Sequence, residues 1–130
     1  MIVLDTHIWV WWVTSVDKLS ARQAEAIRAG ESDAIGVSAI SCWEVAKLVA
    51  LGRLALALPL DDWMEVALQY PGVTLLPLTA QIAIASTRLP GEFQNDPADQ
   101  IIVATARAHD CPLLTRDGKI LKYPEVNTIA

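Results

Sequence analysis

The sequence predicts an α/β fold with a mostly parallel central sheet of four to five strands. Short apolar runs rich in Val, Ile and Leu alternate with segments whose apolar residues recur at helical spacing, the pattern of strands joined by helices. The chain has 130 residues, enough for one compact domain with a sizeable core. Its composition, 53 % hydrophobic and 19 % charged, is that of a folded protein. We therefore expect residues 1–130 to form a single domain.

The first half of the chain is expected to hold two strands, each followed by a helix. Ser20 with Gln23, and Ser41 with Glu44, both have the spacing of a capping box, in which two side chains satisfy free N–H groups at a helix start. The expected elements are a strand at 1–4, a short helix from 7, a helix from 20 to about 29, a strand at 34–38 and a helix from 41 to 52.

The second half continues the alternation. Thr79 is expected to cap one helix, and Asp96 followed by Pro97 is a typical N-cap with proline at the first helical position. The helix that follows is apolar nearly all round, which predicts that it is buried. The expected elements are a helix from 60, a strand at 73–77, a helix at 79–89, a helix from 97 to about 109, a strand at 112–115, a short helix from 118 and a strand at 126–129.

Five carboxylates are predicted to lie at one edge of this sheet. Asp5 and Asp117 follow strands, and Glu44 lies in the first turn of the helix after the second strand. Asp96 and Asp99 begin a helix that runs antiparallel to the strand it feeds, so they lie at the same edge. Ligands of open α/β sheets bind outside the carboxyl ends of the strands. Asp5 in particular is expected to serve the site, because the end of a strand gains nothing obvious from a carboxylate.

Helix capping is the alternative explanation for most of these acids. Glu44 and Asp99 each occupy a position that stabilises a helix start by a few tenths to about 1 kcal/mol, and Asp117 precedes a glycine in a turn. Capping does not explain why the acids converge, since two carboxylates 4 Å apart repel by about 4 kcal/mol at an effective dielectric constant near 20. An all-oxygen cluster favours a hard divalent cation, Mg²⁺ or Mn²⁺, rather than Zn²⁺.

Charge and composition restrict the possible partners. The net charge of −5 and pI of about 4.8 argue against a broad basic face that holds nucleic acid, although a bound metal ion can reverse the charge locally. Lys47, Arg116 and Lys119 are the cations expected near the acids and are candidates for substrate binding. Cys42 and Cys111 form no disulfide framework. With neither signal peptide nor membrane span expected, the sequence predicts a cytoplasmic protein.

Taken together, these motifs resemble the PIN-domain ribonucleases of the VapC toxin type. The resemblance covers essentially the whole chain, and no single motif carries it alone. The matching motifs, in order, are Leu4-Asp5-Thr6-His7, Ser41-Cys42-Trp43-Glu44, Asp96-Pro97-Ala98-Asp99 and Leu114-Thr115-Arg116-Asp117. It implies a PIN-like α/β/α arrangement with helices on both sides of the sheet.

The resemblance also implies a function. It implies a Mg²⁺- or Mn²⁺-dependent endoribonuclease that hydrolyses RNA phosphodiester bonds and acts as the toxin of a toxin–antitoxin pair. The implied partners are RNA, a cognate antitoxin whose segment blocks the site, and a second copy of the chain. The catalytic and metal-binding residues it implies are Asp5, Glu44, Asp99 and Asp117, supported by Thr6, Asp96 and Thr115. One departure stands out: Asn95 and Ala98 occupy positions where many relatives carry a basic residue and an aromatic.

Two other functions are compatible with the same acids. One is a DNA-directed or structure-specific nuclease, and the other is a non-catalytic domain whose acids bind a basic partner. The tryptophans bear on partners as well. We expect most of them in the core, with Trp43 internal beside Glu44, whereas Trp9, Trp11 and Trp12 cannot all face one side of a helix. At least one of these three is expected in a surface groove that binds a partner.

Overall fold

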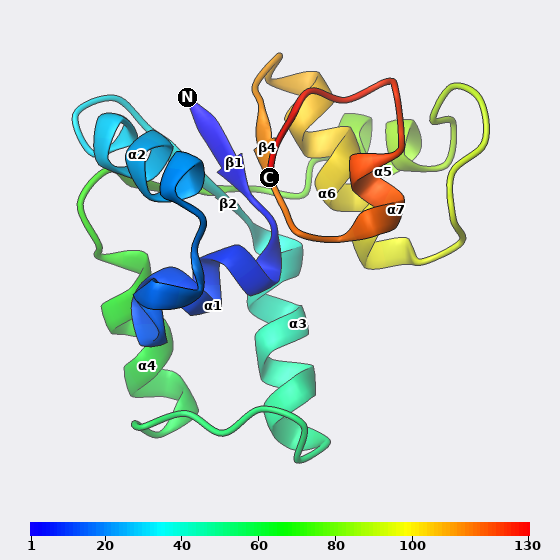
Figure 1. Ribbon diagram of the computed structural model, residues 1–130. Helices are drawn as coiled ribbons and strands as arrows, with labels where there is room; N and C mark the ends of the chain where they lie inside the picture. The colour runs from blue at the N-terminus through cyan, green and yellow to red at the C-terminus, as the bar shows by residue number, and fades with distance from the viewer.

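The computed structural model describes all 130 residues and contains one sheet of five parallel strands (Figure 1). Their order across the sheet is β3-β2-β1-β4-β5, so the N-terminal strand is central. The strands are β1 (Ile2–Leu4), β2 (Ile35–Ser38), β3 (Val73–Leu76), β4 (Leu113–Leu114) and β5 (Thr128–Ile129). The predicted α/β fold with a parallel sheet is confirmed, including the fifth strand.

Helices cover both faces of the sheet. The helices are α1 (Thr6–Thr14), α2 (Ala21–Gly30), α3 (Ala39–Ala50), α4 (Leu60–Leu68), α5 (Ala80–Ser86), α6 (Pro97–Ala108) and α7 (Gly118–Leu121), with a 3₁₀ turn at Val16–Lys18. In Figure 1, α1, α2 and α4 lie on one side of the strands and α5, α6 and α7 on the other. The three-layer arrangement is therefore confirmed, and no helix has both the length and the apolar character needed to cross a membrane.

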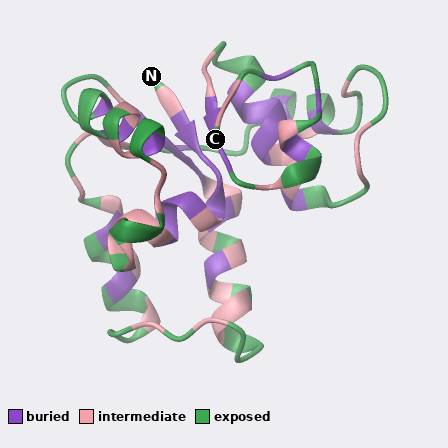
Figure 2. Ribbon diagram, viewed as in Figure 1, coloured by how far each residue is buried: buried purple, intermediate pink, exposed green.

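Alternation along the central strands divides the core into two clusters. Leu4 and Leu114 pack with residues of α1 and α4, whereas Val3 and Leu113 pack with residues of α6 and α7. Neighbouring residues of a strand point to opposite faces, and both faces are covered at the centre of the sheet, so β1 and β4 are apolar throughout. Figure 2 shows the resulting buried band along the strands and the helix faces that meet them. β1 is thereby held between both layers, and its end is fixed.

Two predicted helix boundaries are wrong. The helix after β2 starts at Ala39 rather than at Ser41, because β2 runs straight into it and the Ser38 side chain accepts the first free N–H, from Ile40. Glu44 consequently lies in the second turn of α3, and no capping box forms with Ser41. The helix capped by Thr79 ends at Ser86, three residues before the predicted end at Leu89. The capping box of Ser20 and Gln23 is confirmed.

Trp43 does not lie inside the protein, contrary to prediction. Its relative exposure is 56 %, whereas Ser41 and Val45 on the same helix are fully buried. A residue two positions from each of these lies about 200° away around the helix and faces solvent. The other tryptophans divide as expected: Trp9 and Trp63 are buried and contact each other edge to face, with ring centroids 5.1 Å apart.

Candidate active site

Four of the predicted acids line one pocket at the carboxyl edge of the sheet. Asp5, Glu44, Asp99 and Asp117 border a cavity of about 270 Å³ together with Thr6, His7, Val10, Trp11, Leu48 and Leu54. These acids come from four separate parts of the chain, which meet because β1, β2 and β4 are parallel neighbours and α6 begins at the same edge. The predicted convergence of these four acids is confirmed.

Thr115 connects the two acids that follow β1 and β4. Its hydroxyl donates to Asp5 Oδ2 at 2.7 Å and accepts the backbone N–H of Asp117 at 3.0 Å. The other oxygen of Asp5 accepts the N–H of Thr6 at 2.8 Å, so Asp5 also caps α1. Asp117 caps α7 through Oδ1. Capping and convergence thus coexist in the same side chains.

A second hydrogen-bond chain holds Glu44. The Thr6 hydroxyl lies 2.5 Å from Glu44 Oε1 and 2.9 Å from Ser41 Oγ. Because Thr6 has one hydroxyl proton and Glu44 can only accept when ionised, Thr6 donates to Glu44 and Ser41 donates to Thr6. The sequence suggested Ser41 only as a helix cap. In the structure Ser41 is buried, and its hydroxyl is hydrogen-bonded to Thr6, 35 positions earlier in the chain.

Asp99 is held by a residue that sequence reasoning missed. Gln94 Nε2 donates to Asp99 Oδ2 at 2.6 Å, and Gln100 Nε2 donates to the Gln94 carbonyl at 2.9 Å. Gln94 lies in the loop before α6, where the sequence has no periodic signal that could have marked it. Asp96 accepts the Asp99 N–H at 3.0 Å and acts as the N-cap of α6, outside the residues that line the pocket.

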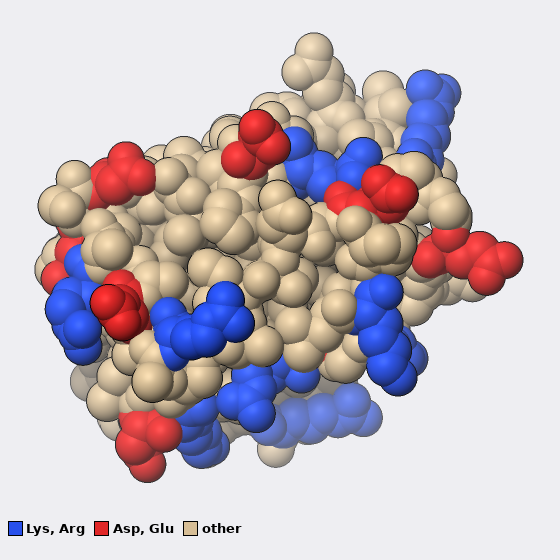
Figure 3. Space-filling view, turned by 45° about the horizontal axis from the view of Figure 1, so that its top comes forward, with Lys and Arg blue, Asp and Glu red and all other residues tan.

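The predicted cations do not neutralise these acids. Lys47, Arg116 and Lys119 are exposed, and the ion pairs of the protein do not include any of them. The nearest basic group is His7, whose Nδ1 lies 3.7 Å from Asp5 Oδ2. Acidic and basic side chains are interspersed on the face shown in Figure 3, with several Lys and Arg residues along its lower margin. The carboxylates therefore lack a compensating Lys or Arg.

Burial raises the pKa values of three of the site acids, Asp5, Glu44 and Asp99. Burial, followed by the negative charges of Asp5, Asp96, Asp117 and Glu44, raises the pKa of Asp99 to about 7. Burial also raises the pKa values of Asp5 and Glu44, against the opposing effect of the hydrogen bonds from Thr115, Thr6 and the Thr6 backbone. A raised pKa means that the ionised carboxylates are unfavourable in the metal-free site. A bound cation would stabilise their ionised form.

These pKa values predict that the metal-free protein loses stability as pH rises. Asp99 keeps its proton to about pH 7 when folded but releases it near pH 3.8 when unfolded, so the folded state binds more protons between these values. Asp5 and Glu44 act in the same direction. Urea unfolding with a chelator present should show this decline up to about pH 7, with a smaller slope for Asp99→Asn. Identical slopes for the two proteins would contradict it.

The donor set suits a hard divalent cation. The pocket offers carboxylate and hydroxyl oxygens and lacks cysteine, and its one imidazole, from His7, already accepts a hydrogen bond from the backbone N–H of Arg116. In the observed arrangement no three His, Cys, Asp or Glu side chains are grouped closely enough to hold a metal ion. The acids thus share a pocket without forming a closed coordination shell. Asp5, Glu44, Asp99 and Asp117 are the residues of this pocket that could hold such an ion.

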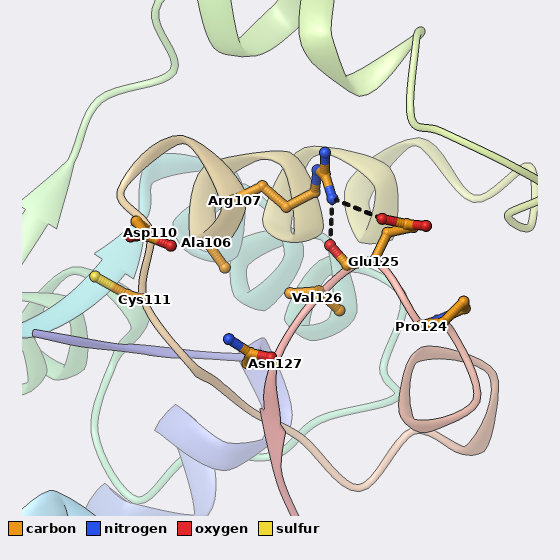
Figure 4. Close-up of a pocket in the computed structure, with 8 residues that line it drawn as sticks. All are labelled: Ala106, Arg107, Asp110, Cys111, Pro124, Glu125, Val126 and Asn127. Carbon is orange, nitrogen blue, oxygen red and sulfur yellow. Dashed lines mark hydrogen bonds and ion pairs between the residues drawn. The ribbon is translucent and has the colours of Figure 1, made fainter.

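A pocket at the opposite edge of the sheet differs in its electrostatics. It has a volume of about 290 Å³ and lies between the end of α6 and the segment that leads into β5 (Figure 4). Its single cation, Arg107, donates to the Glu125 carbonyl and lies 3.9 Å from the Glu125 carboxylate. Arg107 is therefore already paired with an acid, whereas the four acids of the first pocket form no ion pair with a Lys or Arg. The acidic pocket at the carboxyl edge differs from the pocket beside Arg107 in having no Lys or Arg among its lining residues.

Comparison with known proteins identifies the family to which the chain is similar. The family model described as PIN domain matches residues 2–126. Ribonuclease VapC22 from Mycobacterium tuberculosis is 34 % identical over 122 residues, which cover 94 % of this chain and 91 % of that protein. The similarity therefore extends over nearly the full length of both chains.

Solved structures share the fold at lower sequence identity. VapBC2 from Rickettsia felis, solved with a DNA fragment from its promoter, aligns with a TM-score of 0.69 at 16 % identity, covering 99 % of this chain and 98 % of that chain. A toxin–antitoxin complex from Klebsiella pneumoniae aligns with a TM-score of 0.67 at 20 % identity, covering 100 % and 97 %. At these identities the likeness shows the fold.

Proposed function

The chain belongs to the PIN-domain family, and from that premise we propose that it is a metal-dependent endoribonuclease, the toxin of a toxin–antitoxin pair. The observation that carries the proposal is the pocket in which Asp5, Glu44, Asp99 and Asp117 converge without a compensating Lys or Arg. The full-length similarity to a ribonuclease supports RNA as the substrate. The proposed cofactor is Mg²⁺ or Mn²⁺.

The proposed roles follow from how each acid is held. Asp5 is 3 % exposed and its two oxygens receive donors from Thr6 and Thr115, so it is the most rigid candidate ligand. Asp99 has one donor, from Gln94, and is the second candidate ligand. Glu44, aligned by Thr6, is placed to bind the cation or orient a water molecule, and Asp117 to complete the site.

The proposed reaction is hydrolysis of an RNA phosphodiester. A divalent cation in the pocket would offset the repulsion between phosphate and carboxylates and assist the attack of water on phosphorus. The protein supplies the carboxylates that hold and orient the reacting groups, of which Asp5 is buried and Glu44, Asp99 and Asp117 are half-buried. Water adds to phosphorus as the bond to the 3′-oxygen breaks, leaving a 5′-phosphate and a 3′-hydroxyl. Exposed Lys47, Arg116 and Lys119 are candidate contacts for flanking phosphates.

A comparison of RNA with DNA tests the substrate class. We expect the purified protein with Mn²⁺ to cleave a single-stranded RNA and to leave DNA of the same sequence intact under identical conditions. Equal cleavage of both would instead support the alternative of a DNA-directed or structure-specific nuclease. If neither is cleaved and calorimetry detects no Mn²⁺ binding at millimolar concentration, the third function, a non-catalytic acidic interaction domain, would be favoured.

An apolar groove beside the acids is the proposed binding site for the antitoxin. It has a volume of about 620 Å³, runs between α1, α4 and the segment 54–58, and shares Val10, Trp11 and Leu54 with the acidic pocket. Trp11 therefore lies in a surface groove, as one of the three N-terminal tryptophans was predicted to. Leu58 and Val66 are 44 % and 46 % exposed along it, which suits the apolar face of a helix. A segment bound here would reach the acids directly.

Charge substitutions in the groove should weaken antitoxin binding. We expect Leu58→Asp to raise the dissociation constant of the co-expressed cognate antitoxin at least about tenfold, because it places a charge in an apolar contact. The matched control is Ile84→Asp on α5, which is 52 % exposed and outside this groove. Unchanged binding by Leu58→Asp, measured by calorimetry, would place the antitoxin elsewhere. The homodimer remains a prediction, to be measured by light scattering.

A further inference from the structure

His7 lies between the acidic pocket and the apolar groove. Its side chain is 32 % exposed, lines the acidic pocket, and meets the ring of Trp11 edge to face with centroids 5.1 Å apart. Its Nε2 accepts the backbone N–H of Arg116 at 2.9 Å. A residue in the first turn of α1 thereby contacts a residue of the β4–α7 junction 109 positions later in the chain.

The segment held by His7 is the one that delivers Asp117. β4 ends at Leu114, and the last strand-type hydrogen bond of this segment runs from the Thr115 N–H to Ile129. Beyond it, two bonds connect the segment to the start of α1: the Thr115 hydroxyl donates to Asp5, the N-cap of α1, and the Arg116 N–H donates to His7 in its first turn. Asp117 comes next in the chain, and both bonds hold the backbone that leads to it, while its own N–H bonds to the Thr115 hydroxyl and its carboxylate caps α7.

The hydrogen bonding of His7 argues against a role in proton transfer. Its Nε2 lone pair is used by the Arg116 N–H, so the neutral ring carries its proton on Nδ1. Nδ1 faces Asp5 Oδ2 at 3.7 Å, too far for a hydrogen bond. Neither nitrogen is therefore free to accept a proton from a water molecule while the contact with Arg116 persists.

We propose that His7 is a positioning residue of the acidic site, which holds the β4–α7 junction through the Arg116 backbone and so places Asp117. The inference deepens the proposed nuclease function and rests on it for its catalytic consequence. It assigns to His7 a role that depends on a hydrogen-bond acceptor at the position of Nε2 and not on its charge. Another side chain with a hydrogen-bond acceptor at the position of Nε2 should therefore be able to take over this role.

Two substitutions separate the acceptor from the bulk of the side chain. In His7→Leu the packing volume against Trp11 is largely kept but the acceptor is lost, whereas His7→Gln carries an amide oxygen at about the reach of Nε2. We expect kcat for single-stranded RNA with Mn²⁺ to fall roughly tenfold in His7→Leu with KM changed less than about twofold, and to recover in His7→Gln to within about threefold of the parent.

Amide hydrogen exchange gives a readout that is independent of activity. We expect exchange of the Arg116 amide to accelerate at least about tenfold in His7→Leu and to return towards the parent rate in His7→Gln, while the amide of Val37 in β2 is unchanged. An unchanged Arg116 rate in His7→Leu, or equal loss of kcat in both variants, would overturn the proposal. If the parent cleaves no RNA, the proposed function fails, and the exchange comparison still decides whether His7 holds this junction.

Discussion

Asp5→Asn is expected to lower the rate of RNA cleavage at least about a hundredfold while the protein stays folded. Asn is nearly isosteric with Asp, so the substitution removes the negative charge and changes the shape of the site very little. It takes away the most buried of the four carboxylates and the one that the central strand holds in place. Cleavage of a single-stranded RNA in Mg²⁺, with parent and variant at equal concentration, measures the effect.

The same substitution should leave stability nearly unchanged. The amide oxygen can still accept the Thr6 N–H, and the amide nitrogen can donate to the Thr115 hydroxyl, which now accepts there instead of donating. Burial raises the pKa of Asp5, so the ionised carboxylate is unfavourable in the metal-free protein. Replacing it with a neutral amide removes that unfavourable charge. We expect a free energy of unfolding within about 1 kcal/mol of the parent. Full cleavage activity in a folded Asp5→Asn variant would refute the proposed role.

Trp9→Ala is expected to destabilise the protein by about 3–5 kcal/mol. Trp9 is completely buried in the cluster that joins α1 and α4 to β1, and it contacts Trp63 edge to face. Its removal leaves a large cavity beside the strand that delivers Asp5. The indole N–H of Trp9 has no hydrogen-bond partner, so no polar contact is lost with the ring. Urea unfolding at fixed pH measures the free-energy change.

Trp43→Ala is the matched control for that prediction. It removes the same side chain from a position that is 56 % exposed, and the free energy of unfolding should change by less than about 0.5 kcal/mol. A comparable loss of unfolding free energy in the two variants would show that burial does not determine how much each tryptophan contributes to stability.

Much of the site could be predicted because its position follows from local rules. An acid after a buried parallel strand, as at Asp5, must lie at the carboxyl edge of the sheet, and a helix that feeds such a strand must begin there, as at Asp99. Neither inference requires knowledge of which distant residues touch. The order of the strands and the pairing of β4 with β5 required the structure.

The resemblance implied Thr6 and Thr115 as supporting residues, but which acid each of them holds could not be predicted, because these contacts join distant parts of the chain. Thr6 aligns Glu44 from 38 positions away, and Thr115 reaches Asp5 from 110 positions away. Gln94 lies in a loop, where no periodicity indicates the direction of a side chain. The error at Trp43 had a local cause: the capping-box spacing suggested a helix start at Ser41 and gave no information on which face of the helix was buried.

The central claim is that the converging carboxylates form a metal-dependent ribonuclease site. The most direct test is to map cleavage ends on total RNA with Mg²⁺ for the parent, for Asp5→Asn, and for the parent with EDTA. We predict new ends with 5′-phosphates and 3′-hydroxyls in the parent alone. The same ends in all three samples, or ends with 2′,3′-cyclic phosphates that persist in EDTA, would contradict the claim.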